Sequence, residues 1–522
     1  MKEQDKQDSA NKRYYITTAL DYPNAEPHIG HALEKIAADV VARYHRLLGH
    51  DTYLSMGLDE NSQHVVQAAR DRQVPIPAWI ESMDVAFRQA LAALDISYDR
   101  WMRTTEPAHV RASQEMFRRA QAAGDIYKST YTGWFCPNCN SFYRDDELVN
   151  GACPNHPSRK PDWVEEEDYF FALSAYCDRL LSHITSHPDF IVPVSRQSEI
   201  VGIIRQGLRD FPVSRPVNRI DAQWGVPVPG DLDNVIYVWF DALTNYLTAV
   251  GFPEGGELFA RYWPADAHVI GKDITRFHCL YWPAMLMSAG LPLPRQVAVH
   301  GFLTLEGKRI SKTAGNVVSP LELVEAYGVD AVRFYLLRHL SFASDGDFSR
   351  AGLIQRYNDE LAKDLGNLLN RVVSMIQRYR GGQIPATGEP GALELDVQRA
   401  AGEVRQQAGQ ALESWEIGHA LNSVWSFVRR INRYLEERKP WRLAAQQEAA
   451  AELDVVLITA AESLRLAAIL LAPFLPTAAN RMLDQLGLDG MRSSAWYDEG
   501  TWGGRALSAV APGPILFPRI EV

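Results

Sequence analysis

The sequence predicts an α/β protein with a Rossmann-type parallel sheet, an inserted zinc-knuckle domain and, after them, an all-α helical bundle. Three observations predict this fold class. A strand, a helix and a second strand follow one another before residue 60. Two short cysteine and histidine pairs interrupt the α/β pattern, and apolar residues recur every three or four positions from residue 352 onward.

The first α/β unit begins at residues 14–20, a run rich in β-branched and aromatic residues that is typical of a buried strand. Apolar residues at helical spacing cover 29–48, and Gly49 ends the predicted helix. Residues 52–58 form a second strand. The three elements therefore make a βαβ unit, from which a parallel sheet grows.

A second α/β stretch carries predicted strands at 235–239, 268–270 and 297–300. Between the two halves the sequence changes to turns, aromatic residues and a cysteine cluster, which predicts an inserted domain. After residue 352 a glycine- and proline-rich run at 381–391 separates one helix from three or four more. We therefore expect a polar tail (1–13), the two sheet halves (14–125 and 229–300), the insert (126–228), a loop region (301–350), a helical domain (351–490) and an irregular C-terminal peptide (491–522).

The composition excludes several classes of protein. With 46% hydrophobic and 22% charged residues the chain is neither disordered nor fibrous. The net charge of −11 means that any nucleic acid must be bound by local basic faces. The longest nearly uncharged run, 466–479, is too short to cross a bilayer, and the polar N-terminus is not a secretory signal. Five cysteines do not make a disulfide scaffold, so we expect a cytoplasmic protein without membrane contact.

Two segments indicate a phosphate site. The first is His28-Ile29-Gly30-His31, at the start of a helix that follows a strand. Such a helix offers free N–H groups to phosphate, the histidines add donors, and Gly30 leaves room for a nucleotide. The second is the glycine-bracketed basic loop 307–315, which can close over a triphosphate. Taken singly, the histidines could be ordinary helix caps and the loop a solvated charge run.

The cysteine cluster predicts one structural zinc ion. Cys136 and Cys139 form one short-spaced pair, Cys153 and His156 form a second, and 13 residues separate them. Paired ligands at this spacing fit a closed tetrahedral site. The alternative is a set of free thiols.

These motifs together resemble class I aminoacyl-tRNA synthetases. The tetrad at 28–31 is similar to their HIGH signature, and Arg309-Ile310-Ser311-Lys312-Thr313 is similar to KMSKS, with Arg309 at the position of its first lysine. The resemblance implies that His28, His31, Arg309 and Lys312 are catalytic, and that His28, Gly30, His31 and Lys312 bind ATP, which Mg²⁺ accompanies. An amino acid would be activated as its adenylate and then passed to tRNA.

Further segments resemble methionyl-tRNA synthetases in particular, among them residues 233–242 and 271–284. Position by position, this resemblance implies a methionine pocket with Asp59 on the substrate ammonium and seven other lining residues: Leu20, Tyr22, Trp239, Ala242, Tyr246, Ile274 and His278. A thioether packs well against aromatic rings. Without the resemblance, Trp239 is a core residue of a strand that enters a helix. The chain departs from the family at Asp21, Asn61, Ser62 and Leu243, which leaves the effect on the pocket open.

The helical domain contains a candidate anticodon site. Asn367 and Arg371 share one helix face, and Trp441 follows a proline at a helix start. An aromatic ring beside an amide and a guanidinium can hold unstacked bases, although an exposed pair and a half-buried tryptophan would have the same pattern. The resemblance implies that these residues read the CAU anticodon.

The resemblance therefore implies a monomeric methionine–tRNA ligase that uses L-methionine, ATP and tRNA(Met) for initiation and elongation. Two alternative functions fit the sequence less well. About 280 residues between His28 and Arg309 leave no room for the editing domain of the leucine, isoleucine and valine enzymes, and the cysteine enzyme holds zinc in its pocket rather than in an insert. A non-catalytic tRNA-binding relative is disfavoured by intact His28, His31, Asp59 and Lys312.

Overall fold

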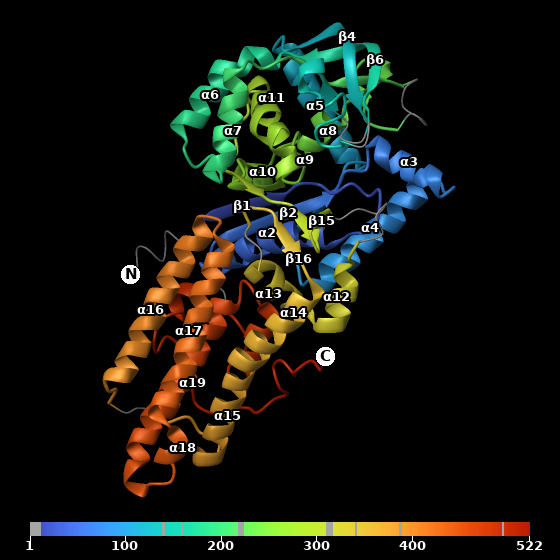
Figure 1. The fold of residues 1–522 in the computed structure, drawn as a ribbon. Coiled ribbons are helices and arrows are strands. Elements are labelled where there is room, and N and C mark those ends of the chain that lie inside the picture. Colours follow the sequence, from blue (N-terminus) through green and yellow to red (C-terminus); the bar gives the residue numbers. More distant parts are fainter. Residues whose placement is uncertain are drawn as a thin grey trace.

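A six-stranded sheet lies at the centre of the molecule, between an upper lobe and a long helical bundle (Figure 1). The computed structural model describes residues 12–137, 141–157, 160–217, 224–309, 317–339, 342–385, 389–492 and 495–521. Neighbouring strands in this sheet are all parallel, in the order β3-β2-β1-β12-β13-β7. Their bounds are β1 Arg13–Thr18, β2 Asp51–Leu58, β3 Arg100–Arg103, β7 Ile191–Val192, β12 Ala267–Gly271 and β13 Val297–His300.

The predicted βαβ unit is confirmed. Helix α2 (Ile29–Leu47) connects β1 to β2 and is buried over most of its length. The chain then forms α3 (Gln63–Asp71), α4 (Ile76–Ala93) and α5 (Pro107–Ala122). Strand order reverses between β1 and β12, because the first half of the chain builds the sheet to one side and the second half to the other. A crevice at such a switch point is where sheets of this type bind ligands.

The predicted strand at 235–239 is wrong in both place and partner. Strand β11 covers Asp231–Ile236 and pairs antiparallel with β9 (Ser214–Pro216) and β10 (Pro227–Val228), apart from the central sheet. Val238 already begins helix α8 (Val238–Leu243). A short apolar run with aromatic residues suits a buried helix as well as a strand, and tertiary packing decided between them.

The upper lobe is built on a long antiparallel hairpin. Strands β4 (Ile126–Cys136) and β6 (Asp162–Phe171) pair over ten residues, and β5 (Ser141–Tyr143) and β8 (Phe211–Pro212) complete their sheet. Helices α6 (Cys177–Ser186) and α7 (Val194–Arg205) follow. Between these helices the chain returns to the centre, because β7 pairs with β13 at the edge of the parallel sheet. The sequence analysis predicted an inserted domain over all of 126–228, a range that includes β7.

The second sheet half supplies the short helices around the crevice. They are α8, α9 (Asn245–Thr248), α10 (Glu257–Tyr262), the π-helical turn η6 (Phe277–Tyr281) and α11 (Trp282–Ser288). After β13 a small sheet of β14 (Leu303–Leu305), β15 (Lys308–Arg309) and β16 (Gly346–Phe348) forms at the edge of the crevice.

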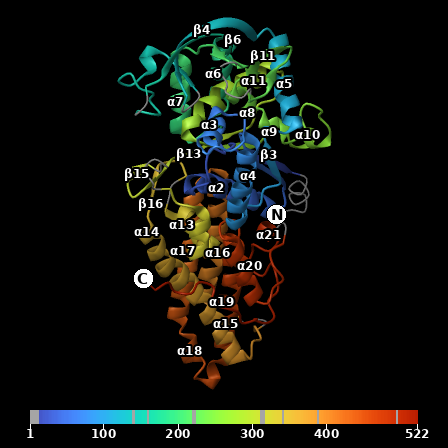
Figure 2. The ribbon, with the colours of Figure 1, turned by 90° about the vertical axis from the view of Figure 1, so that its right-hand side faces the viewer.

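The helical domain extends away from the central sheet (Figure 2). After α12 (Pro320–Tyr327) and α13 (Val329–His339), its first helical stretch is continuous from α14 (Arg350–Arg356) through a π-helical segment, η7 (Tyr357–Gly366), into α15 (Asn367–Arg380). Gly381, at φ 62°, ends it where the sequence predicted. The others are α16 (Ala392–Glu413), α17 (Ile417–Arg438), α18 (Pro440–Leu443), α19 (Ala450–Leu471), α20 (Pro476–Gln485) and α21 (Ala495–Asp498).

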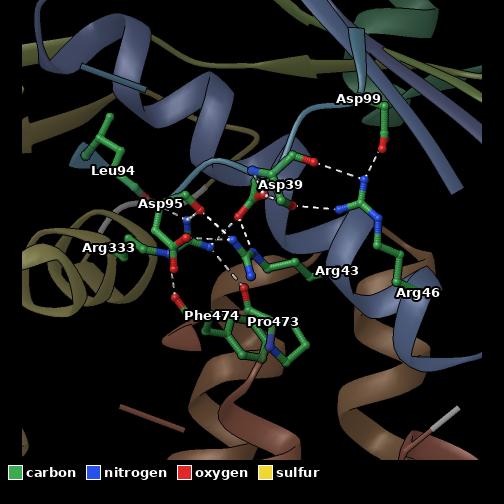
Figure 3. Close-up of polar contacts among 10 residues, drawn as sticks. Asp39, Arg43, Arg46, Leu94, Asp95, Asp99, Arg333, Pro473 and Phe474 are labelled. Carbon is green, nitrogen blue, oxygen red and sulfur yellow. Dashed lines mark hydrogen bonds and ion pairs between the residues drawn. The ribbon is translucent and has the colours of Figure 1, made fainter. Parts of the chain in front are cut away.

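A buried polar centre joins the sheet to the bundle (Figure 3). Arg333 of α13 is fully buried, and its guanidinium donates to Oδ2 of Asp39 on α2 at 2.8 Å. It also donates to four backbone carbonyls, those of Leu94 (3.1 Å), Asp95 (3.5 Å), Pro473 (3.1 Å) and Phe474 (2.8 Å). The last two lie in the corner between α19 and α20. One apolar core continues from α2 into these helices, so the two domains pack as one body.

Candidate active site

One cavity of about 650 Å³ opens at the carboxyl ends of β1 and β12. Side chains from widely separated parts of the chain line it. They include all the residues predicted for methionine and three of the four residues of the tetrad: Leu20, Tyr22, His28, Gly30, His31, Asp59, Trp239, Ala242, Tyr246, Ile274 and His278. The structure therefore brings these side chains together, while the role of each stays a prediction.

The two histidines of the tetrad cap α2. Nδ1 of His28 accepts a hydrogen bond from the backbone N–H of Gly30 at 3.1 Å, and Nδ1 of His31 accepts from that of His28 at 3.0 Å. Because a backbone N–H can only donate, the proton of each neutral ring lies on Nε2. The cap and the donor function are thus compatible. A Cβ at Gly30 would lie 2.8 Å from Cε1 of His28, so the glycine also makes room for the capping ring.

Aromatic side chains form one end of the cavity. Trp239 stacks on Phe277 with ring centroids 3.8 Å apart, and Tyr22 meets Trp239 edge to face at 6.4 Å. The Tyr246 hydroxyl lies 2.7 Å from Nε2 of His278, whose Nδ1–H donates to the Ile274 carbonyl at 3.0 Å. Burial lowers the pKa of His278 to about 4, so this ring is neutral near pH 7. This end of the cavity is therefore apolar and polarizable, and Tyr246 and His278 give it one uncharged polar pair.

Asp59 is a buried carboxylate at the same cavity, only 2% exposed. Burial raises its pKa well above the usual value, and the charge of Asp241 raises it further. The backbone N–H of Asn61 donates to its Oδ1 at 3.3 Å. The charged groups that act on Asp59 are Asp241 and Glu60, both acidic. Such a carboxylate is suited to receive a cationic group of a ligand.

Buried ionic groups that the sequence analysis did not single out also face the cavity. Glu34 and His300 line it beside Asp21, and Lys35 lies behind them, 1% exposed. Glu34 Oε2 is 3.0 Å from Nε2 of His300. A signal was present, because His300 is the last residue of a predicted strand and polar residues at strand carboxyl ends meet at the crevice.

The basic loop begins at the rim of the cavity. Leu303 and Thr304 line it, and β14 leads directly to β15. Arg309 is the last residue of β15. Lys312 and the rest of 310–316 lie outside the described residues. The expected meeting of Lys312 with His28 therefore remains a prediction.

Three of the four predicted zinc ligands come together in the upper lobe. Nδ1 of His156 lies 3.8 Å from Sγ of Cys136 and 3.7 Å from Sγ of Cys153. Two tetrahedral ligands of zinc, one sulfur and one nitrogen, are roughly 3.6 Å apart at ordinary bond lengths. Cys139 lies outside the described residues. The three groups could hold a metal ion, with His156 as a good candidate ligand.

Comparisons with known proteins agree over nearly the whole chain. Residues 14–160 and 156–373 match the family model "tRNA synthetases class I (M)", and 384–518 match "Anticodon binding domain of methionyl tRNA ligase". Methionine–tRNA ligases of Caldanaerobacter subterraneus subsp. tengcongensis and Mycobacterium tuberculosis are 43% and 42% identical, over 98% of this chain and 79% and 98% of theirs. The solved structure titled "Mycobacterium tuberculosis methionyl-tRNA synthetase in complex with methionyl-adenylate" has a TM-score of 0.93 and 41% identity, covering 97% of this chain and 100% of that one.

The chain belongs to the methionyl-tRNA synthetase family. The structure shows what surrounds three of the residues at which the chain departs from the usual family pattern. The Asn61 amide donates to Oδ2 of Asp241 at 2.7 Å, and Leu243 is a buried lining residue. Asp21 pairs with Lys35 at 3.1 Å. Asn61 thus binds the carboxylate next to Asp59 without carrying charge.

The predicted anticodon residues gather at the far end of the bundle, in the part that matches the family's anticodon-binding model or just before it. The Arg371 guanidinium lies 5.7 Å from the ring centre of Trp441, which is 40% exposed. Arg371 also pairs with Glu436 at 2.8 Å, and Asn367 is exposed one turn earlier on α15.

Among the residues that the structure describes, none of the helices has the length and hydrophobicity needed to span a bilayer.

Proposed function

We propose that the chain is a methionine–tRNA ligase. It activates L-methionine with ATP to methionyl-adenylate, releases pyrophosphate, and transfers methionine to the 3′ end of tRNA(Met) for initiation and elongation. One observation carries this proposal: a single cavity joins a polarizable aromatic end, a buried carboxylate and a histidine-capped helix N-terminus. These are the groups needed by a thioether, an ammonium and a phosphate.

In the first step Asp59 binds the ammonium of methionine, while Trp239 and Tyr22 pack against its side chain. The methionine carboxylate then lies free to attack the α-phosphate in line. The Nε2–H groups of His28 and His31, together with Lys312, stabilise the charge that grows on the phosphate oxygens. Mg²⁺ accompanies ATP and neutralises part of its charge.

In the second step a ribose hydroxyl of tRNA attacks the adenylate carbonyl and loses its proton, and AMP leaves as the bond from the carbonyl to the phosphate oxygen breaks. Asn367, Arg371 and Trp441 would read the CAU anticodon by stacking and hydrogen bonding to unstacked bases. A zinc ion held by Cys136, Cys139, Cys153 and His156 would stabilise the upper lobe without taking part in the reaction, because all four positions are filled by protein. We further expect a monomer that works in the cytoplasm, where translation takes place.

Amino-acid-dependent exchange of pyrophosphate into ATP tests the proposal. With methionine, ATP and labelled pyrophosphate, the purified chain should show exchange that requires methionine. Leucine, valine and cysteine at the same concentration should give little. Exchange driven by one of these three and not by methionine would reject the assignment, and aminoacylation of tRNA(Met) then tests the second step.

A further inference from the structure

A chain of buried charged groups crosses the floor of the cavity. The Lys35 ammonium donates to the Ala19 carbonyl at 3.0 Å and to Oε1 of Glu34 at 2.5 Å, and it lies 3.1 Å from Oδ2 of Asp21. Glu34 and His300 are each 7% exposed. Because Glu34 uses its second oxygen for His300, one carboxylate links two cations.

Hydrogen bonding assigns a positive charge to His300. Its Nδ1 lies 2.8 Å from the Gly301 carbonyl, and its Nε2 lies 3.0 Å from Oε2 of Glu34. A carbonyl can only accept a hydrogen bond, and the same holds for a carboxylate. Both ring nitrogens of His300 therefore donate, and a ring with two N–H groups carries a positive charge. Burial alone would lower the pKa of His300, but Glu34 and the Gly301 carbonyl raise it. Burial would raise the pKa of Glu34, but Lys35 and His300 lower it to about 2.

The Glu34–His300 pair joins two elements that approach the cavity from different halves of the chain. Glu34 lies on α2, one turn after His31, and His300 ends β13. Directly after His300 the chain turns at Gly301 into β14 and the basic loop. A Cβ at Gly301 would lie 2.2 Å from backbone atoms of Ser344, so this turn is tightly enclosed.

We propose that Glu34 and His300 are positioning residues for ATP. Their ion pair fixes the histidine-bearing start of α2 against the base of the hairpin that leads to Lys312. It also places a fixed positive charge at the wall of the cavity. This inference rests on the proposed function, because it assigns the two residues to the ATP side of that reaction.

A role in folding alone is the competing explanation, so the test separates ATP from methionine. Glu34→Gln and His300→Asn are measured by methionine-dependent pyrophosphate exchange, with each substrate varied in turn. Glu394→Gln is the matched control: this carboxylate is 2% exposed, accepts from the Tyr434 hydroxyl at 2.7 Å and pairs with Arg438 at 2.9 Å, but lies in the bundle. Thermal unfolding of all variants is recorded alongside.

We expect the KM for ATP to rise about tenfold in both cavity variants, as for loss of one buried charge-assisted hydrogen bond. The KM for methionine should stay within about twofold, and the double variant should be little worse than either single one. Glu394→Gln should leave both KM values unchanged. If the cavity variants only unfold earlier, as the control does, or if both KM values rise together, the positioning role is wrong. Absence of exchange in the unmutated chain would instead reject the proposed function.

A pH profile gives a second, independent readout. In Glu34→Gln, His300 loses the group that raises its pKa, and burial then lowers that pKa, so the ring loses its proton as the pH rises. The kcat/KM for ATP should therefore fall in this variant as the pH rises through that lowered pKa, and stay level over the same pH range in the unmutated chain. The other titratable groups near the pair are Asp21, Lys35, His28, Asp273, Tyr246 and His278. Burial raises the pKa of Asp21 to about 6, so this carboxyl could also titrate during the experiment. The profile is therefore repeated in an Asp21→Asn background, in which the fall in kcat/KM for ATP should persist. Parallel profiles for the two proteins would overturn the inference.

Discussion

Replacing Arg333 by methionine should weaken the joint between the sheet and the bundle. The guanidinium is fully buried and donates to one carboxylate and to the carbonyls of Leu94, Pro473 and Phe474. Breaking a buried ion pair costs roughly 3–5 kcal/mol when the remaining charge is left uncompensated. In the variant Asp39 still contacts Arg43 at 2.8 Å and the Ser97 hydroxyl at 2.6 Å. The cost of losing the Arg333–Asp39 ion pair should therefore lie at the lower end of this range. Each of these three carbonyls that loses its donor adds up to roughly 1 kcal/mol, less where water enters, so we expect a total loss of about 3 to 6 kcal/mol.

Urea unfolding followed by circular dichroism and tryptophan fluorescence measures this loss. Because Arg333 contacts both the α2 side and the α19–α20 corner, its loss should uncouple the two domains, and the variant should unfold in two separated steps. Arg46→Met is the matched control. That arginine also binds a loop aspartate, Asp99, at 2.7 Å, but it is 29% exposed and should cost less than about 1 kcal/mol. Equal midpoints for the two variants, with a single transition in each, would refute the reasoning.

Four further predictions concern the proposed sites. Lys312→Ala should slow adenylate formation at least about tenfold with little change in methionine affinity, measured by single-turnover kinetics; an unchanged rate would remove its catalytic role. Trp441→Ala should reduce aminoacylation of tRNA(Met) about tenfold or more and leave pyrophosphate exchange intact, because base stacking is worth roughly 1–3 kcal/mol. Cys153→Ala should lower the zinc content from one ion per chain to none by elemental analysis, and metal-free unmutated protein would refute the zinc site. Because burial and Asp241 raise the pKa of Asp59, the kcat/KM for methionine should fall as the pH drops through that raised pKa, and Asp59→Asn should abolish the dependence.

Local sequence patterns were sufficient where one physical signal dominated. The βαβ unit follows from a β-branched strand, an amphipathic helix and Gly49, and the end of α15 follows from Gly381. The predicted strand at 235–239 failed because its apolar run fits either secondary structure, and the antiparallel partners of β11 are distant in sequence. Likewise, no local pattern shows that Ile191 and Val192 return from the upper lobe to the sheet edge.

In the candidate site, too, residues in local motifs could be predicted from the sequence, whereas residues that depend on a distant partner could not. Motif positions such as His28 and Asp59 could be placed beside one cavity because their signatures are local and the strand ends converge. Glu34 and Lys35 belong to no such signature, although both are buried. A buried charge becomes visible only through its partner, and here the partner His300 is 266 positions away from Glu34.

The departures from the family pattern become intelligible once their partners are known. A carboxylate at position 21 would be costly at a buried site by itself, but it faces Lys35, and the two charges offset each other. Asn61 offers the Asp241 carboxylate a donor that no pH change can remove, whereas an imidazole there would titrate. Neither residue leaves an uncompensated charge next to the substrate groups, because the Asp21 anion faces the Lys35 cation and the Asn61 amide is neutral. We infer that Lys35 cannot be replaced alone, because the Asp21 and Glu34 carboxylates would lose the cation that they share, whereas Asp21→Asn leaves Lys35 paired with Glu34.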